Sequence, residues 1–229
     1  MKNLPGKNWK TLSKKSGRAS AGIKDLTRIQ PPRLTWPQVR EKAEEFRSDN
    51  VLPVDLLPIP IIEIVELKLK LSPIPIFRLL EEIDIDGFLT KDLKSICIDQ
   101  DVYNNPRKEN RLRFTFAHEV GHFVLHKQEI QLCRFRTPGD WMRFRDDFEE
   151  DDLYWFEQQA YEFAGRLLVP RDHLITEIER LATKILEYKK LGGSDEDKII
   201  HAISRSICKN FAVSADVIAR RIKSEKIRL

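Results

Sequence analysis

The sequence predicts an α+β protein in which a small sheet of the antiparallel type packs on a layer of helices. Short strand-like segments occur in the first half of the chain, IDGFLT at residues 85–90 and SICIDQ at residues 95–100. Almost everything after residue 110 has helical periodicity. Strands followed by helices are typical of an α+β domain, and 229 residues with 41% hydrophobic content suffice for one large domain with a small appendage.

The elements that flank these strands are indicated by prolines and capping residues. A helix is predicted over residues 35–50, because Thr35 can cap its start and Pro37 suits its first turn. The next segment, VDLLPIPIIEIVELKLKL at residues 54–71, mixes periods. Its internal prolines confine any helix to the residues after them, and its final LKLKL alternates like a strand. After the strands, DVYNNPRKEN at residues 101–110 is predicted to be a loop, because Asn-Asn-Pro breaks regular structure.

Charge divides the chain into unequal parts. The net charge is +4, but residues 1–33 hold nine Lys and Arg against the single acid Asp25, which leaves 31 basic and 35 acidic residues, a charge of −4, for the rest. The first segment is poor in apolar residues and is expected to be flexible, either as a weak nucleic-acid contact or as a solvated tail. The predicted organisation is a basic tail at 1–33, a folded domain at 34–172 and a helical extension at 173–229.

Cysteine usage and hydropathy bear on the compartment. Cys97, Cys133 and Cys208 lie far apart and form neither a CxxC pair nor a disulfide framework, which favours a reducing environment. No apolar run approaches the ~18 residues of a membrane span. The basic N-terminal segment also lacks the apolar stretch of a secretory signal. We therefore expect a cytoplasmic protein with no membrane partner.

The strongest functional signal is RFTFAHEVGHFVLH, residues 113–126. On a helix, His118 and His122 lie one turn apart on the same face, so both imidazoles can reach one ion. Glu119 is rotated by ~100° from His118, which suits a base acting on a water molecule better than a third ligand. The alternative is a core helix whose histidines are hydrogen-bonded to neighbours. A zinc site would require a third ligand from another element.

The segment EQQAYEFAGRLLVP, residues 157–170, offers that third ligand. Glu157 lies at the edge of the apolar stripe of an amphipathic helix, and the small Ala160 and Ala164 would let this helix approach the histidine helix closely. A carboxylate in such a place needs a partner, either a zinc ion or a salt bridge. Glu162 is rotated by ~140° from Glu157 and is expected to face solvent.

Together, RLRFTFAHEVGHFVLH and EQQAYEFAGRLLVP resemble the paired signature of the ImmA/IrrE family of zinc metallo-endopeptidases, over about residues 50–170. The resemblance implies a zincin-like fold built around the HExxH helix. It also implies that His118, His122 and Glu157 bind one Zn²⁺ per chain and that Glu119 is the catalytic acid and base.

The resemblance further implies the substrate. Family members are mostly bacterial or phage-encoded proteins that act on DNA-binding repressors and relieve repression after stress or mobile-element induction. We therefore expect a protein substrate of the helix-turn-helix repressor type. Tyr161 stands where the family usually has asparagine, and it is expected to support a ligand or to contact the substrate.

Two further histidines have smaller expected roles. His126 continues the histidine face, but its rise of roughly 12 Å from His118 is too great for it to share the ion. It is expected to pack in the core or to support a ligand. His173 is expected either at the cleft, as a donor to the substrate, or on the surface.

The C-terminal segment supports an alternative class of protein, a DNA-binding regulator or an interaction protein with a structural zinc site. Residues 194–226 predict two helices around a tight turn, with Ser194 and Ser214 as N-caps. The second helix carries basic residues, as in a DNA-reading helix-turn-helix. These candidate nucleic-acid contacts are Arg220, Arg221 and Lys223. The turn lacks the usual glycine, which favours a plain helical hairpin that covers the core.

Overall fold

A computed structural model describes residues 30–132, 150–190 and 195–229. This part of the chain is α+β and mostly helical. Its strands are β1 (Ser72–Ile76), β2 (Gly87–Leu89) and β3 (Ser95–Asp99). Its α-helices are α1 (Trp36–Asn50), α2 (Ile61–Glu63), α3 (Leu79–Ile83), α4 (Gln100–Asn104), α5 (Glu109–Leu125), α6 (Lys127–Leu132), α8 (Glu150–Leu168), α9 (Arg171–Glu179), α10 (Ala182–Lys190), α11 (Glu196–Phe211) and α12 (Ala215–Ser224). Among these helices, none combines the length and apolar character needed to cross a membrane.

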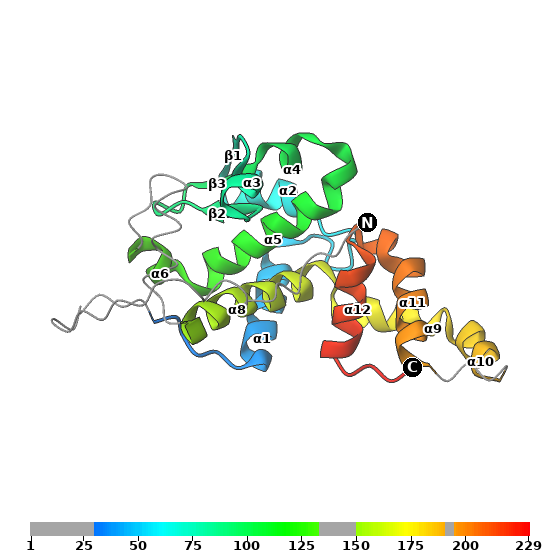
Figure 1. Ribbon diagram of the computed structural model, residues 1–229. Coiled ribbons are helices and arrows are strands. Elements are labelled where there is room, and N and C mark those ends of the chain that lie inside the picture. Colours follow the sequence, from blue (N-terminus) through cyan, green and yellow to red (C-terminus); the bar gives the residue numbers. More distant parts are fainter. Residues whose placement is uncertain (1–29, 133–149, 191–194) are drawn as a thin grey trace, which may run out of the picture.

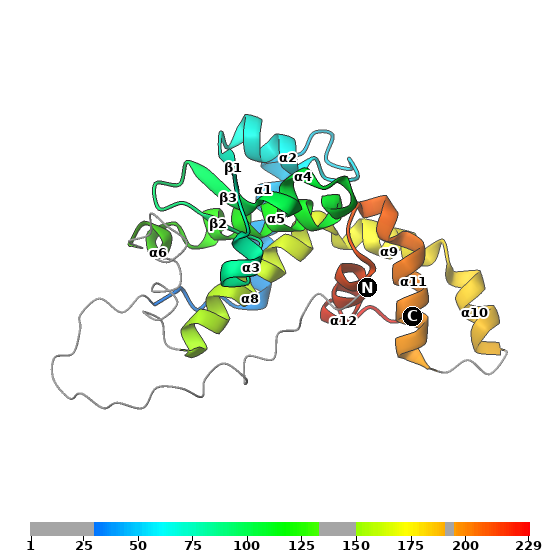
Figure 2. The same cartoon turned by 45° about the horizontal axis from the view of Figure 1, so that its top comes forward.

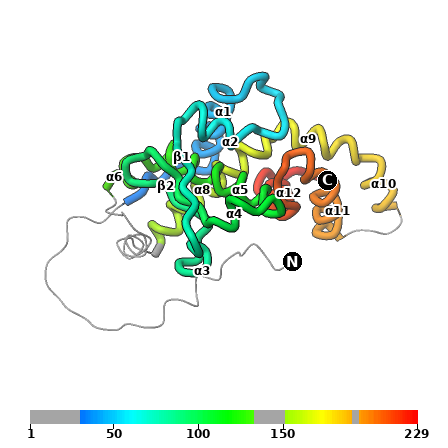
Figure 3. The backbone as a smooth tube through the Cα atoms, turned by 90° about the horizontal axis from the view of Figure 1, so that it is seen from above, coloured from blue at the N-terminus to red at the C-terminus, as the bar shows by residue number. Residues whose placement is uncertain are grey.

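The architecture has a small sheet on one side of a helical layer. The strands lie above α5, which in turn lies on α8 (Figure 1). Helix α5 contacts β2 and β3 on one side and α8 on the other, and α1 packs against α8. The C-terminal helices α9 to α12 gather at the end of the molecule away from the sheet (Figure 2). The same separation is evident from above the sheet, in Figure 3.

Helix α1 begins as the sequence predicts. Thr35 is its N-cap, and the backbone N–H and the hydroxyl of Thr35 both donate to Gln38 Oε1 at 2.9 Å. The Gln38 side chain thus satisfies the Thr35 N–H, one of the groups that a helix start leaves without an internal partner. The buried face includes Phe46, whose ring meets that of Phe163 edge-on at 5.8 Å and so joins α1 to α8.

The sheet is mixed, so the prediction of an antiparallel type was partly wrong. Strands β2 and β3 coincide with the two predicted segments and pair antiparallel, but β1 pairs parallel to β3, and the order is β1-β3-β2. LKLKL is not a strand, because a π-helical turn occupies Ile64–Lys68 and β1 begins only at Ser72. The sequence SPIPI was not recognised as a strand because prolines cannot donate to a ladder. At a sheet edge this loss is tolerated.

The predicted loop at residues 101–110 was also wrong, because it contains ordered helical turns. Helix α4 and a 3₁₀ turn at Pro106–Lys108 lie between β3 and α5. The Asp99 carboxylate accepts from the N–H groups of Asp101 and Val102, which starts α4 directly at the end of β3. The connection is therefore held by a local side-chain cap that outweighs the breaker residues.

The C-terminal segment forms the predicted helical hairpin, α11 and α12. Ser214 caps α12 by accepting from Val217 N–H, as expected. The cap of α11 is Asp195, which accepts from Lys198 N–H, whereas Ser194 lies outside the described residues. Ala212 adopts the left-handed conformation at φ 49°, so an alanine fills the position where glycine is usual.

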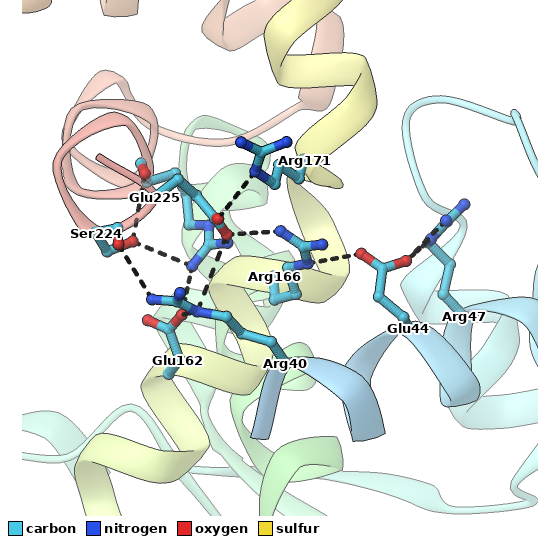
Figure 4. A network of polar contacts seen from close by, with 9 residues as sticks. Arg40, Glu44, Arg47, Glu162, Arg166, Arg171, Ser224 and Glu225 are labelled. Atoms are coloured by element: carbon cyan, nitrogen blue, oxygen red, sulfur yellow. Dashed lines mark hydrogen bonds and ion pairs between the residues drawn. The ribbon is translucent and has the colours of Figure 1, made fainter. Parts of the chain in front are cut away.

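A buried ion network attaches α12 to α8 and α1 (Figure 4). Arg221 is 2% exposed; its guanidinium donates to Glu162 at 2.8 Å and also contacts Glu225. Glu162 accepts a second hydrogen bond from Arg40 at 2.5 Å. The prediction that Glu162 faces solvent was therefore wrong, because α1 and α12 cover that side of α8. Further ion pairs extend the network. Arg166 pairs with Glu44 and Glu225, Arg171 pairs with Glu225, and Arg47 pairs with Glu44.

The residues just before α1 are packed against α8. Residues 1–29 of the predicted tail lie outside the described part of the chain. Within residues 30–33, the Pro32 carbonyl accepts from Gln159 Nε2 at 2.7 Å. Arg33 pairs with Asp152 at 2.5 Å and lies over the Trp155 ring at 5.7 Å. The segment that enters α1 is thus anchored to the same helix that carries Glu157.

Candidate metal centre

Donor atoms of three residues converge where α5 crosses α8. His118 Nε2 lies 3.1 Å from His122 Nε2 and 3.3 Å from Glu157 Oε2, and His122 Nε2 lies 3.9 Å from Glu157 Oε1. Ligands bound tetrahedrally to one zinc ion at ~2.0–2.1 Å are about 3.3 Å apart. Among the described residues, these three form the group whose donor atoms could hold a metal ion. Two imidazoles and one carboxylate in this geometry fit such an ion.

The close crossing of the two helices depends on small residues. A Cβ at Gly121 would lie 3.1 Å from both the Cα and the backbone oxygen of Ala160, and 3.3 Å from the Phe163 ring. Ala160 and Ala164 are completely buried, as their predicted place between the helices requires. A larger residue at Gly121 would therefore separate the histidines from Glu157.

Burial determines the protonation of the ligand candidates. His122 is buried, and this desolvation, together with the charges of the two neighbouring histidines, holds the pKa of His122 well below its ordinary value. It is therefore neutral, the form of imidazole that binds metals. Burial also lowers the pKa of His118, but its hydrogen bond to Glu157 and the charge of that carboxylate outweigh the effect, and the pKa of His118 is raised.

Glu119 lies beside the cluster and points toward the sheet. It is 4% exposed, and its carboxylate accepts from the backbone N–H of Leu89 in β2. Burial raises the pKa of Glu119 to about 7; the charge of His118 opposes this rise and that of Glu157 adds to it. A carboxyl group with such a pKa can both accept and release a proton near neutral pH.

Tyr161 lies against His118 on the side of the cluster that remains accessible. The centroids of the two rings are 4.5 Å apart, and the tyrosine also stacks on Phe114 at 6.0 Å. Tyr161 is 38% exposed. It therefore borders the site where a substrate would approach, one turn after Glu157 along α8.

His126 is not a member of the donor cluster but contacts it from behind. Its Nδ1 lies 3.0 Å from His122 Nδ1, and its Nε2 lies 3.2 Å from Gln159 Oε1. Sequence reasoning missed Gln159. The available signal was a polar residue spaced with Phe156, Ala160 and Phe163 on the apolar face of a helix, where it must find a buried partner.

The remaining candidates lie elsewhere. His173 is in α9, where its Nδ1 is buried without a hydrogen-bond partner among the described residues, and it is not one of the three converging donor residues. Arg220 and Lys223 are exposed, and Lys223 pairs with Asp197 at 2.7 Å. Arg221 is buried in its ion network, so the prediction that it contacts nucleic acid is not compatible with this structure.

The fold and this site together define a metallopeptidase-type protein, with two histidines and a carboxylate facing each other across two packed helices. The chain belongs to the Peptidase_M78 family, whose IrrE N-terminal-like domain matches residues 62–223. The match confirms the resemblance to the ImmA/IrrE family. It extends through α11 and most of α12, so the hairpin is part of the matched region. A search of curated proteins found no match.

Proposed function

We propose that this protein is a zinc-dependent endopeptidase with a zincin-like catalytic domain. The convergence of His118, His122 and Glu157 carries the proposal. Two imidazoles and one carboxylate suit zinc, and three protein ligands leave a fourth position for a reacting molecule. Family membership supports hydrolysis of a peptide bond as the reaction.

The residues of the chain divide the chemistry between them. A zinc ion bound by the three ligands would supply a Lewis acid and lower the pKa of water. Glu119 would accept the proton of the attacking water and deliver it to the leaving nitrogen as the C–N bond breaks. Its pKa of about 7 supports both transfers, and the hydrogen bond from Leu89 orients its carboxylate.

Strand β2 offers a place for an extended substrate. Asp86 C=O accepts from Asp99, and Thr90 N–H donates to Ser95, so the backbone groups of Gly87 and Leu89 point to the opposite edge of β2. The Leu89 contact with Glu119 agrees with this alternation. A peptide lying along that edge would pass beside the catalytic carboxylate, and its main chain could pair with the strand.

The substrate that we propose is a DNA-binding repressor of the helix-turn-helix type. Support for this part comes from the resemblance of the two motifs to the ImmA/IrrE family. Tyr161, beside His118, is the residue of this chain that we expect to contact such a substrate. Replacing Tyr161 by phenylalanine or asparagine should change KM for a cleaved repressor and leave the metal content of the protein nearly unchanged.

The test combines metal analysis with the Glu119→Gln variant. Wild-type protein purified without chelators should contain one zinc per chain and cleave a candidate repressor. Glu119→Gln should retain the zinc but lose about 100-fold or more in kcat, because an amide cannot accept the proton. His118→Ala should lose most of the zinc. Wild-type protein without a stoichiometric divalent metal would defeat the proposal, and full activity of Glu119→Gln would remove Glu119 from the mechanism.

A further inference from the structure

A chain of buried hydrogen bonds connects the metal cluster to the backbone before α1. It runs from His122 Nδ1 to His126 Nδ1 at 3.0 Å, from His126 Nε2 to Gln159 Oε1 at 3.2 Å, and from Gln159 Nε2 to Pro32 O at 2.7 Å. Neither His126 nor Gln159 has any exposed surface. These hydrogen bonds cross from α5 to α8 and then to Pro32, which lies 127 residues before Gln159 in the sequence.

The Pro32 carbonyl, at the end of this series of hydrogen bonds, determines which atom donates in each of them. A carbonyl oxygen can only accept, so the Gln159 amide nitrogen must face Pro32 and its oxygen must face His126. His126 therefore donates from Nε2. In a neutral imidazole the other nitrogen then accepts, so the proton between the two histidines belongs to His122 Nδ1. His122 Nε2 is left without a proton, and this is the atom that faces His118 and Glu157.

We propose that His126 and Gln159 are positioning residues that hold His122 in the Nδ1–H tautomer, with Nε2 ready to bind the metal ion. This inference rests on the proposed metal site. A metal-bound histidine commonly donates its other N–H to an acceptor that fixes its tautomer and ring orientation. In this protein a neutral imidazole is that acceptor, and a glutamine and a backbone carbonyl determine which way the imidazole is protonated.

The opposite arrangement, with donors and acceptors exchanged along these hydrogen bonds, is unfavourable on geometric grounds. It would place Gln159 Oε1 against the Pro32 carbonyl, so that two acceptors would meet at 2.7 Å. A doubly protonated His126 would force His122 Nδ1 to accept and would move the His122 proton to Nε2, where it would block the metal. The Phe156 ring lies 4.3 Å from the His122 ring and 4.4 Å from the His126 ring, which restricts rotation of both.

Contacts around Pro32 keep its carbonyl in place. Arg33 pairs with Asp152 and lies over Trp155, and Trp36 packs on the same Trp155 ring at 5.1 Å. Asp152 and Trp155 belong to α8, as Gln159 does. The same helix therefore holds both the Pro32 carbonyl and the Gln159 amide that this carbonyl orients. The direction of the hydrogen bonds thus does not depend on a loose segment.

The first measurement is the tautomer of His122 in metal-free wild-type protein. Long-range ¹H–¹⁵N correlations distinguish a protonated Nδ1 from a protonated Nε2. We expect Nδ1–H for His122 and Nε2–H for His126. A His122 that carries its proton on Nε2 would overturn the proposal. This measurement needs no substitution, so it decides the question even if a variant fails to fold.

The second measurement is zinc affinity of full-length variants, by competition with a chromophoric chelator. Gln159→Met removes the amide at similar length and should weaken zinc binding about 10- to 100-fold, the usual cost of losing a supporting hydrogen bond. Gln158→Met is the matched control on the adjacent, half-buried position and should bind zinc like the wild type. Gln159→Glu should restore most of the affinity, because a protonated carboxyl can accept from His126 and donate to Pro32.

These results separate the inference from the proposed function. Unchanged zinc affinity in Gln159→Met, or equal loss in Gln159→Met and Gln159→Glu, would overturn the positioning role. Zinc content of the wild type and the inactivity of Glu119→Gln would be unaffected by that outcome. Failure of the metal site itself would instead appear as wild-type protein without zinc.

Discussion

The carboxyl group of Glu119 is held by parts of the chain far apart in sequence. Helix α5 carries it, the Leu89 N–H donates to it from β2, and desolvation raises its pKa to about 7. A raised pKa means that the acid is protonated over a wider pH range than an exposed glutamate. A cation at the neighbouring donors would counteract this shift, because positive charge favours the carboxylate.

Peptidase activity should therefore rise with pH as Glu119 ionises. A general base works only when deprotonated, so kcat/KM should fall as pH decreases through the pKa of Glu119 in the free enzyme. Because a bound metal ion would lower that pKa, we expect the half-maximum at or below about pH 7, in a series from about pH 5 to pH 8. Zinc content measured at each pH is the control. A rate that increases toward acid would contradict this role for Glu119.

At the scale of elements, the site depends on how closely α5 and α8 approach. Each helix by itself presents its ligands to one side, but the distance from Nε2 to the carboxylate is set by the helix contact at Gly121 and Ala160. Glycine within a helix costs ~1 kcal/mol relative to alanine. The close packing of α5 on α8 compensates for this cost. A Cβ at Gly121 would meet backbone atoms of Ala160, which cannot rotate away.

Gly121→Ala should destabilise the protein despite the better helix propensity of alanine. Overpacking costs typically ~1–3 kcal/mol, against a propensity gain of ~1 kcal/mol, so we expect a net loss of about 1 kcal/mol together with weaker zinc binding. Denaturant unfolding and chelator competition measure the two effects. Gln128→Ala, at an exposed position of α6, is the control. A variant more stable than the wild type would show that the helices can separate freely.

At the scale of the whole molecule, ion pairs attach the C-terminal hairpin to α8, the helix that carries Glu157. Arg221 in α12 reaches Glu162, which lies in α8 five residues after Glu157. Arg40 joins the same carboxylate from α1, as Figure 4 shows. Gly165 leaves room for this contact, because a Cβ there would lie 3.0 Å from Arg221 Cδ. The hairpin thus helps to position the helix that carries Glu157, the proposed third ligand.

Arg221→Met should lower the free energy of unfolding by about 2–4 kcal/mol. Breaking a buried pair typically costs ~3–5 kcal/mol, and the remaining arginines around Glu225 should reduce that cost. Arg220→Met changes the adjacent exposed arginine and should stay within ~0.5 kcal/mol of the wild type. Urea unfolding at constant zinc provides the comparison. Equal stability of the two variants would mean that the network contributes nothing to the fold.

Nucleic-acid binding, the alternative function, should reside in residues 1–29. They hold eight Lys and Arg, the nine of residues 1–33 without Arg33. We expect weak duplex binding that is indifferent to sequence, falls steeply with salt and disappears in a protein beginning at Gln30. That protein retains Pro32 and Arg33 and should keep its zinc and peptidase activity. Tight, sequence-specific binding by the truncated protein, lost when Arg220 and Lys223 are neutralised, would favour a DNA-binding regulator.

Local patterns in the sequence predicted the parts of this protein whose causes are local. Thr35 caps α1 through its own first turn, and helical periodicity places His118 and His122 on one face. The same periodicity identified Glu157 near the buried face of α8, and the two strands near residues 87 and 97 follow from short apolar segments. Each of these features depends on residues within a few positions, so the sequence by itself determined them.

Tertiary structure decided the features whose partners are distant. The strand SPIPI exists because β3 accepts it at a sheet edge, and its parallel direction follows from the path of the connection. Glu162 is half-buried because α1 and α12 cover it, which no pattern within α8 reveals. The tautomer of His122 depends on Pro32, 90 positions away from it in the chain. Burial by remote segments, rather than local spacing, determines which polar groups must pair.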